Sequence, residues 1–485
     1  MKRFTNTFGN WVRGAGNKEG IQIMRKIKIG LLPLYIQLYD DKTPELRPRA
    51  EAFYNAVAGA MRGLGVEVMT APVCRVKKEF ADTVDKFFEG GAAGIATLHL
   101  AYSPSLEAID SLCGSPLPIL VLDITDTFSF GPGQETDEIM YNHGIHGAQD
   151  LCCMLTRRDR PYEIVAGHAG SGRVADAISA WANSAGCAAS LHKVKAGIIG
   201  EPFAGMGDFQ VPASIIKDRF GVSTVRYDEE QGRIDLEMLV QREIADEVSL
   251  LKEIFNCSAV DEEMLNKTAK TDLVIQKWIE RENLGAFTAS FPDVKRGIGL
   301  DMMPFAAASL AMSRGVGYAG EGDVLTSALV RSLAAVYDRA SFTEMFCPDW
   351  EGGSVFLSHM GEMNIAMAAQ KPRLLRKPFI YTDIGDTVSP AGLFLPGEAA
   401  IVNLAPTKNG GFRLIICKGD MLAVEGKDNF TDCIHGWFKP RKELGVFLEE
   451  YGRLGGTHHS ALVYGASGAG LEYFGRMIGC ETFVI

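Results

Sequence analysis

The sequence of 485 residues contains neither a CxxC pair nor an apolar run long enough to cross a bilayer. Its ten cysteines are scattered, and several lie in apolar or helical patterns such as DLCCML at 150–155. We therefore expect reduced thiols rather than the disulfide framework of a small secreted domain. With a formal net charge of −11, the chain also lacks the basic excess of a nucleic-acid-binding surface. These absences favour a cytoplasmic protein that binds neither membranes nor nucleic acids and acts on a neutral or cationic small molecule.

A dinucleotide-binding motif at the first strand and a repeat architecture are lacking as well. No GxGxxG motif follows the first expected strand, which disfavours a nucleotide-dependent dehydrogenase. The chain has no internal repeat and no low-complexity linker. Apolar residues make up 47% of the sequence and charged residues 22%, which is the balance of a folded globular protein. Because 485 residues exceed what one hydrophobic core usually supports, we expect two or three domains.

The chain does contain an alternation of apolar strands and amphipathic helices, which predicts parallel strands with crossover helices. Strands are expected at 26–36 and 93–102, and a long charged helical region at about 233–283. From about residue 376, short β-rich runs joined by turn residues indicate an antiparallel barrel or sandwich. The predicted fold is α/β, with two Rossmann-like α/β domains that contain parallel sheets and a C-terminal, mostly antiparallel β-barrel domain. We divide the chain into an N-terminal extension (1–24), an N-terminal α/β domain (25–192), a central α/β domain (193–345) and a C-terminal β-rich domain (346–485).

The first candidate site lies in GVGYAGEGDVLTSALV at 315–330, where four glycines make a sharp loop. Asp323 is placed to cap the helix that begins after it, and Glu321 lies just outside the N-terminus of that helix. Glycine lets backbone and side chain approach a ligand closely at such a loop. Two interpretations stay open: Glu321 contacts a ligand, or it is a solvated residue beside a capped helix.

The next segment, ASFTEMFCPDWEGGSVFLSHMGEMN at 340–364, contributes a carboxylate and an imidazole. Glu344 lies between Phe342 and Phe346, and a buried carboxylate is costly unless it is paired or coordinated. His359 ends the apolar run SVFLSHM. A lone histidine in such a run is more often a hydrogen-bonded core residue than a ligand, so both interpretations of His359 stay open.

Two adjacent histidines, His458 and His459, follow two glycines in GGTHHSAL, in a sequence with nine histidines overall. Adjacent side chains of an extended strand point in opposite directions, so we do not expect both imidazoles to bind one metal. One can be a ligand while its neighbour meets another group of the site. Alternatively, both are surface residues of a turn.

Together, Glu321, Glu344, His359 and one of the two adjacent histidines offer two carboxylates and two imidazoles. This mixed oxygen and nitrogen set suits a divalent ion such as Mn²⁺, Co²⁺ or Fe²⁺, and it lacks the thiolates of structural zinc. The spacing is long and matches no local metal motif. On chemistry alone the same ligands could activate water in a metallohydrolase, although nothing in the sequence supplies the second metal cluster that many such enzymes use.

At these segments the chain resembles the L-arabinose isomerases, within the broader L-arabinose/L-fucose isomerase superfamily. GEGDVLTSALVR matches the family's EGD segment, FTEMF its second glutamate motif, FLSHMGEMN its HM-x-E motif and LGGTHHSAL its GG-x-HH-(T/S) segment. All four agree in order and approximate spacing. The resemblance implies that Glu321 and Glu344 are catalytic, that both also bind the metal together with His359 and His459, and that His458 contacts the substrate.

The resemblance extends more loosely towards the N-terminus. MYNHGIHGAQDL is similar to the family's N-Q-x-x-HG segment and YIQLYD to its Q-x-L-Y segment, while GMGDFQV lies where the family has a substrate-pocket methionine. His146, Gln37 and Met206 are the substrate-binding residues that these matches imply. The chain departs from the family where NQ becomes Asn142–His143, and in the loops around 126–140 and 200–212.

The resemblance implies a metal-dependent aldose–ketose isomerase with Mn²⁺, or alternatively Co²⁺ or Fe²⁺, as its cofactor. Moving a proton between C1 and C2 of a sugar passes through a cis-enediolate, which a divalent ion stabilises while two glutamates act as acid and base. The substrate would be L-arabinose, converted to L-ribulose, or a related aldose, and the departing loops leave an L-fucose/D-arabinose-type activity open. A homo-oligomer, trimer or hexamer, is implied too, with active sites between subunits and with His146 and Gln37 supplied by a neighbouring subunit.

A non-catalytic sugar-binding protein is the remaining alternative, because two α/β domains flanking a cleft also describe such proteins. Two features count against it. The first residues, MKRFTNTFGNWVRGAGNKEGIQI, show no continuous apolar stretch or cleavage site of a signal peptide, and a third, β-rich domain is expected.

Overall fold

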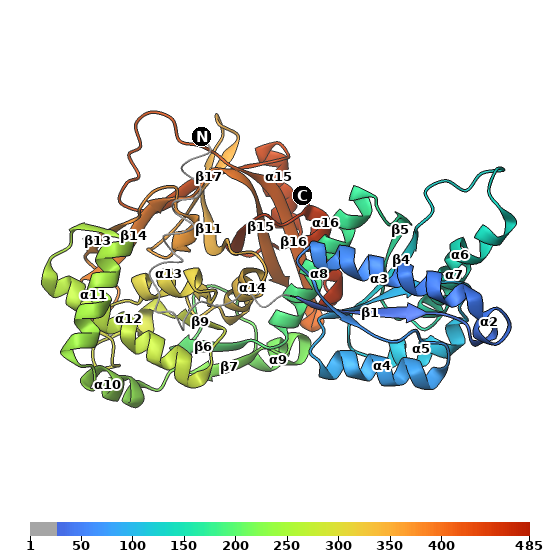
Figure 1. Cartoon of the computed structure of the whole chain (residues 1–485). Coiled ribbons are helices and arrows are strands. Elements are labelled where there is room, and N and C mark those ends of the chain that lie inside the picture. Colours follow the sequence, from blue (N-terminus) through green and yellow to red (C-terminus); the bar gives the residue numbers. More distant parts are fainter. Residues whose placement is uncertain (1–26) are drawn as a thin grey trace. The chain divides into compact units, whose positions relative to one another are not determined.

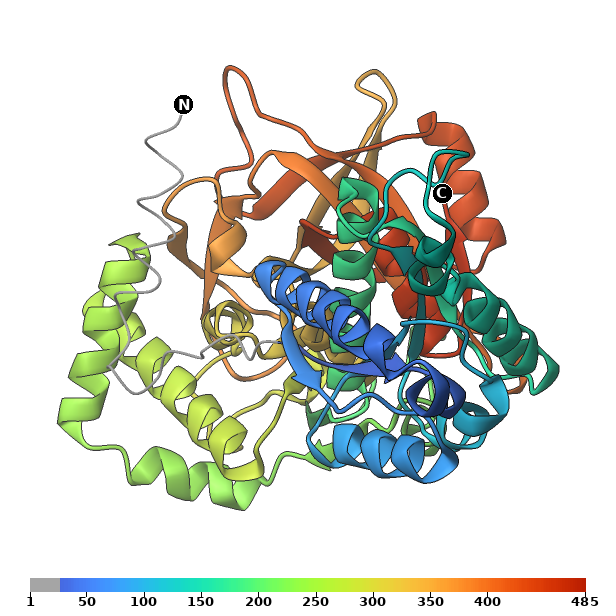
Figure 2. The same ribbon diagram turned by 45° about the vertical axis from the view of Figure 1, so that its right-hand side comes forward.

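The computed structural model describes residues 27–485, and the chain divides into two compact units (Figures 1 and 2). Of the described residues, the N-terminal unit comprises 27–189 and 469–477, and the larger unit comprises 190–468 and 478–485. The expected N-terminal extension, 1–24, lies outside the described residues. The division into domains at 192/193 and 345/346 stays a prediction. Among the described helices, none combines the length and the apolar character that crossing a membrane requires.

The N-terminal unit is built around a parallel sheet, as the strand–helix alternation predicts. Its five strands have the order β2-β1-β3-β4-β5. They are β1 (Lys28–Leu34), β2 (Glu67–Thr70), β3 (Gly94–His99), β4 (Ile119–Thr125) and β5 (Glu163–His168). The helices are α2 (Gln37–Lys42), α3 (Arg47–Gly63), α4 (Lys77–Glu89), α5 (Ser105–Gly114), α6 (Ile139–Asn142), α7 (Gly144–Arg157), α8 (Gly172–Leu191) and, from the far end of the chain, α16 (Gly468–Met477).

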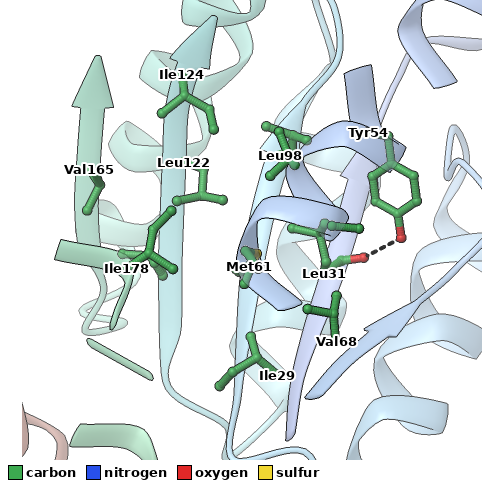
Figure 3. Close-up of a cluster of buried hydrophobic side chains, with 14 of the residues drawn as sticks. Ile29, Leu31, Tyr54, Met61, Val68, Leu98, Leu122, Ile124, Val165 and Ile178 are labelled. Carbon is green, nitrogen blue, oxygen red and sulfur yellow. Dashed lines mark hydrogen bonds between the residues drawn. The ribbon is translucent and has the colours of Figure 1, made fainter. Parts of the chain in front are cut away.

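Apolar side chains cover both faces of this sheet. On one face, strand residues such as Leu31 and Leu122 pack with Met61 of α3 and Ile178 of α8 (Figure 3). The hydroxyl of Tyr54 in α3 donates a hydrogen bond of 3.0 Å to the backbone carbonyl of Leu31. A second apolar cluster joins the sheet to α4, α5 and α7 on the other face. Burial on both faces explains why these strands are nearly uninterrupted apolar runs.

The larger unit contains a second parallel sheet with the strand order β10-β9-β6-β7. Its strands are β6 (Lys195–Ile199), β7 (Ser223–Arg226), β9 (Ala286–Ala289) and β10 (Gly317–Gly320). The helices of this part are α9 (Ala213–Phe220), α10 (Glu229–Glu237), α11 (Gln241–Ile254), α12 (Glu262–Glu282), α13 (Phe305–Ser313) and α14 (Val324–Ala334). The expected helical region at about 233–283 is therefore interrupted. It breaks between α10 and α11, and again at the short strand β8 (Asn256–Ala259).

A ten-stranded mixed sheet makes up the rest of the larger unit, with the order β19-β16-β15-β18-β11-β12-β17-β14-β13-β8 and an additional pairing of β16 with β17. Its other strands are β11 (Ala340–Asp349), β12 (Ser354–His359), β13 (Arg373–Lys377), β14 (Thr387–Leu393), β15 (Gly397–Pro406), β16 (Phe412–Met421), β17 (Ile434–Pro440), β18 (His459–Tyr464) and β19 (Glu481–Val484). Helix α15 (Leu444–Arg453) precedes β18. The α/β class and the parallel sheets are confirmed, whereas the C-terminal β-barrel stays a prediction.

Three neighbouring strands of this sheet bring distant parts of the sequence together. β11 pairs antiparallel with both β12 and β18, and in this register Glu344 lies opposite His459 on one side and Ser358 on the other. The C-terminal end of β12 is His359. The sheet therefore places a carboxylate from the middle of β11 beside two imidazoles, one at the end of β12 and one at the start of β18.

Candidate metal and catalytic site

The turn between β10 and α14 presents Glu321 in an unusual backbone conformation. Glu321 has a φ of 60°, in the left-handed region that non-glycine residues rarely adopt. The glycines on either side allow close packing: a Cβ on Gly320 would lie 2.9 Å from Cε1 of His359, and one on Gly322 would lie 2.6 Å from Cα of Pro202. Backbone conformations of this kind typically cost about 1–3 kcal/mol and concentrate at functional sites. The GEG sequence therefore lets a carboxylate enter a crowded site.

Asp323 connects this turn to the histidine pair. One of its oxygens, Oδ1, caps α14 by accepting the backbone N–H of Thr326 at 2.9 Å, as the sequence predicts. The other, Oδ2, lies 3.0 Å from Nδ1 of His459. Both side chains are buried, with relative exposures of 1% and 0%. A carboxylate on one ring nitrogen fixes the orientation of a histidine and leaves the other nitrogen available.

Glu344 lies between two of the predicted imidazole ligands. Its Oε1 atom is 3.1 Å from Nε2 of His359 and 3.1 Å from Nε2 of His459. The aromatic ring of Phe342, two residues earlier on β11, packs edge-on against both imidazoles. The structure therefore brings these three predicted site residues together, with their polar atoms directed at one another.

A chain of buried hydrogen bonds holds the far side of His359. Its Nδ1 atom lies 2.6 Å from Oε2 of Glu362, which also accepts the backbone N–H of Gly361 at 2.9 Å. The other oxygen of Glu362 accepts a hydrogen bond of 2.9 Å from the hydroxyl of Tyr318, on β10. Because every oxygen of this buried carboxylate has a donor, the arrangement is well satisfied and directs Nε2 of His359 towards Glu344.

The histidine pair does not diverge as strand alternation predicts. Nε2 of His458 and Nε2 of His459 lie 3.6 and 3.8 Å from the same oxygen, Oε2 of Glu321. The prediction was wrong because β18 begins at His459, so His458 belongs to the preceding turn, where strand alternation does not apply. Nδ1 of His458 lies 2.7 Å from Oδ2 of Asp208, and the ring of Phe209 stacks on His459 at 4.8 Å and 14°.

The neighbouring carboxylates raise the pKa values of the buried histidines. Burial lowers the pKa of His359, but Glu362 and Glu344 outweigh this effect and hold it well above the ordinary value. Burial likewise lowers the pKa of His459, but the neighbouring carboxylates of Asp323 and Glu344 outweigh this effect and raise it. Burial raises the pKa of Glu344, but the two imidazoles overcome this and hold it below its usual range.

His458 and Asp208 form a similar pair. Burial lowers the pKa of His458, but the hydrogen bond to Asp208 and the nearby Glu321 raise it to about 10. Burial raises the pKa of Asp208, but His458 outweighs this and lowers it to about 2. Glu344 and Asp208 are therefore ionised at neutral pH, and a cation that binds to the imidazoles must displace protons from them.

The donor set fits a divalent ion. Glu321, His458 and His459 each offer a ligand atom, and these three atoms all lie within 4.8 Å of one another. Oε2 of Glu321 is buried and makes no hydrogen bond within the described chain, and Nε2 of His459 is buried 3.1 Å from Oε1 of Glu344. Neighbouring ligands of an octahedral ion with bonds of about 2.1 Å are about 3 Å apart, which is close to the 3.1 Å contacts of Glu344 with the two imidazoles. The ligand set predicted from the sequence, with His359 and Glu344, stays a prediction.

The remaining predicted residues lie in two places. Met206 is half-buried in the loop that also carries Asp208, and its backbone N–H donates to the carbonyl of Phe203 at 3.3 Å. Gln37 and His146 belong to the N-terminal unit. The amide of Gln37 donates to a carboxylate on its own helix, and His146 lies in the first turn of α7. Their role as substrate ligands from a neighbouring subunit stays a prediction.

Four residues that contact the site were missed by sequence reasoning, although two of them carried a signal. Glu362 is a carboxylate three residues after His359 in an apolar segment, and its burial implies a partner. Asp208 is the acidic residue of GMGDFQV, a segment interpreted through its methionine. The other two residues are Tyr318 and Phe209, and no feature of the local sequence distinguishes them from ordinary core residues.

Comparison with known proteins gives consistent matches. The model of the L-arabinose isomerase central domain matches residues 218–338, and that of the L-arabinose isomerase C-terminal domain matches residues 339–481. The L-arabinose isomerase of Geobacillus thermodenitrificans is 27% identical over 406 residues, which cover 81% of each chain. The L-arabinose isomerase of Anoxybacillus flavithermus is 27% identical over 408 residues (81% of this chain and 80% of the relative), and that of Bacillus subtilis is 26% identical over 418 residues (81% of each). The two matched domains together contain the whole cluster from Glu321 to His459.

Proposed function

This chain belongs to the L-arabinose isomerase family and is an aldose–ketose isomerase, and from that premise we propose that it interconverts L-arabinose and L-ribulose, or a closely related pair of sugars, at the cluster around Glu344. A single observation carries the proposal: one carboxylate oxygen of Glu344 lies 3.1 Å from an imidazole nitrogen of both His359 and His459. Glu321 completes the cluster, with an oxygen that is buried and makes no hydrogen bond in the described chain.

Glu321, Glu344, His359 and His459 are the residues that would hold a divalent ion, with Mn²⁺ the preferred candidate and Co²⁺ or Fe²⁺ as alternatives. When bound, such an ion supplies Lewis-acid polarisation of the sugar oxygens at C1 and C2. The imidazoles of His359 and His459 suit the role of metal ligands. Their Nδ1 atoms lie 2.6 and 3.0 Å from carboxylate oxygens of Glu362 and Asp323, respectively, which leaves Nε2 of each ring to bind the ion.

The two glutamates would move the protons. One carboxylate removes the hydrogen from C2 of the aldose as a proton, and the electron pair of that C–H bond forms the C1–C2 double bond while the carbonyl oxygen O1 gains a proton. The same carboxylate returns its proton to C1, O2 loses its proton, and the ketose results. The second carboxylate takes the proton that O2 loses and passes it to O1, so one proton moves from O2 to O1 through this group and no other proton source is needed. The lowered pKa of Glu344 supports a base that is ionised at neutral pH.

Substrate recognition and assembly complete the proposal. His458 faces the sugar, with Met206 on the neighbouring loop, and His146 and Gln37 reach the substrate from an adjacent subunit of a cytoplasmic trimer or hexamer. Partial exposure of His458, 27% against 0% for His459, supports its place on the sugar side. Light scattering coupled to gel filtration would give the mass of the oligomer, and a monomer with full activity would contradict the shared site.

The test of the reaction is a panel of aldoses with added Mn²⁺, read by NMR for the ketose. L-Arabinose, L-fucose, D-arabinose and D-galactose separate the proposed substrate from its sister activities. Turnover should disappear after chelation and dialysis and return with Mn²⁺. The variants Glu321→Gln and Glu344→Gln should be folded and inactive. Full turnover by the dialysed protein would contradict the metal role, and ketose formation from none of the four sugars would contradict the substrate class.

A further inference from the structure

The loop between β6 and α9, residues 200–212, contacts the site through its backbone. The backbone N–H of Phe203 donates to the carbonyl of Glu321 at 2.9 Å, across the two turns. Gly322 permits this contact, since a Cβ there would lie 2.6 Å from Cα of Pro202. Within the loop, the amide of Gln210 donates to the carbonyl of Phe203 at 2.7 Å. The loop is thus attached directly to the turn that carries Glu321.

The same loop holds both histidines through consecutive side chains. Oδ2 of Asp208 accepts the backbone N–H of His458 at 2.9 Å and also lies 2.7 Å from its ring atom Nδ1. Phe209, which is 5% exposed, stacks on the ring of His459. The two contacts to His458 come from one oxygen of Asp208, and the other oxygen, Oδ1, is buried without a hydrogen bond in the described chain.

His458 and His459 differ in the contacts that restrict their rings. His459 is fully buried, and its ring is restricted both by packing against Phe209 and Phe342 and by the contact of Nδ1 with Asp323. His458 is 27% exposed, and an exposed imidazole without a fixed partner samples several rotamers. A simultaneous contact to its backbone and to Nδ1 restricts the ring and leaves Nε2 pointing into the cluster, 3.6 Å from Glu321. Asp208 is therefore the residue on which the orientation of His458 depends most.

We propose that Asp208 is a positioning residue for sugar binding: by holding the backbone and Nδ1 of His458, it presents Nε2 to a hydroxyl group of the substrate beside Glu321. This inference rests on the proposed isomerase function and adds to it a residue of the 200–212 loop. Asp208 acts through the imidazole and not through the ion, so its loss should weaken sugar binding and leave the binding of the metal alone nearly unchanged.

The experiment compares three variants of the full-length protein. Asp208→Ala removes both contacts, whereas Asp208→Asn keeps a carbonyl oxygen that can accept both N–H groups. Glu201→Ala is the matched control, because it also removes a carboxylate from this loop. The side chain of Glu201 is exposed to solvent and pairs with Arg226. Mn²⁺ affinity is measured by electron paramagnetic resonance, and the affinity of the Mn²⁺-loaded protein for L-arabitol, an open-chain sugar analogue, by calorimetry. The KM and kcat of the aldose identified by NMR provide a third measurement.

We expect Asp208→Ala to weaken L-arabitol binding and to raise KM by about tenfold, with Mn²⁺ affinity changed less than threefold. Asp208→Asn should recover most of the loss, and Glu201→Ala should match the wild type. Unchanged L-arabitol binding in Asp208→Ala, or equal losses in the alanine and asparagine variants, would overturn the positioning role. An equal loss of Mn²⁺ affinity would overturn it as well, since His458 would then be a metal ligand. A wild-type protein that binds neither Mn²⁺ nor L-arabitol and converts no aldose would instead overturn the proposed function.

Discussion

Replacing Glu247 with glutamine is expected to stabilise the protein at neutral pH, although it removes an ionisable residue from a helix. Glu247 lies on α11 and faces Asp272 on the adjacent α12, and the two side chains are only 7% and 1% exposed. These two helices lie side by side in both ribbon views (Figures 1 and 2). Oε1 of Glu247 is buried without a hydrogen bond in the described chain, while the amide of Gln276 donates to Asp272 at 2.8 Å. A negative charge on Glu247 would therefore be poorly compensated.

The magnitude follows from the protonation of this carboxyl. Burial and the facing Asp272 raise the pKa of Glu247 to about 9, while the exposed Arg314 opposes them only in part. In the folded protein at pH 7 the group keeps its proton, but in the unfolded chain it has lost it. Between pH 4.5 and pH 7, loss of this proton therefore lowers the free energy of the unfolded state by about 3 kcal/mol relative to the folded state. The free energy of unfolding falls by the same amount. Because the pKa is raised on folding, stability is greatest below about pH 4.5 and declines as the pH rises towards 9.

Glutamine removes this penalty because it is neutral at every pH and its amide can donate to Asp272. The free energy of unfolding of Glu247→Gln should exceed that of the wild type by up to about 3 kcal/mol at pH 7, and the difference should shrink to near zero at pH 4.5. Urea unfolding at pH 4.5, 7 and 8.5, followed by circular dichroism, measures the difference. Glu253→Gln, an exposed glutamate of the same helix, is the control and should change little at any pH. A difference that does not grow with pH would refute the reasoning.

Three further predictions concern the site. Glu344→Gln should lower kcat at least about 100-fold without changing the circular dichroism spectrum, and steady-state kinetics with near-normal kcat would contradict its acid–base role. Tyr318→Phe removes the hydroxyl that donates to Glu362 and should weaken Mn²⁺ binding about tenfold by paramagnetic resonance titration, whereas wild-type affinity would show that this hydrogen bond does not orient the metal ligand. Gly320→Ala places a Cβ 2.9 Å from the ring of His359 and should reduce the amount of bound metal, which plasma mass spectrometry measures. A folded variant with full metal content would argue against this close approach.

Local sequence signals predicted the parallel sheets and one helix end correctly. The apolar strands of the N-terminal unit are buried on both faces, and such strands read as continuous apolar runs. Asp323 caps α14 because a short acidic side chain just before a helix satisfies its free N–H groups. These features depend on neighbours within a few residues, and a single sequence contains that information.

Features that depend on distant pairing were not predictable in the same way. The expected helix at 233–283 is interrupted by β8, whose sequence NCSA has no strand alternation and which is held by parallel pairing with β13, more than a hundred residues later. Helix α16 belongs to the N-terminal unit although it lies near the end of the chain, and a hydrogen bond joins Ser184 to the carbonyl of Gly470. Neither contact leaves a mark in the local sequence.

The histidine pair shows why the residues of the site were easier to name than to orient. The motifs identify which side chains carry chemistry, but the direction of each ring depends on what lies against it. Strand alternation predicted divergence of His458 and His459, and a strand that begins one residue later allows both to approach Glu321. What then separates them is their second partner, Asp208 for one and Asp323 for the other, from loops more than a hundred residues apart in the sequence. A division of labour between adjacent identical residues can therefore arise entirely from the carboxylates behind them, and substitution of those carboxylates tests it more directly than substitution of the histidines.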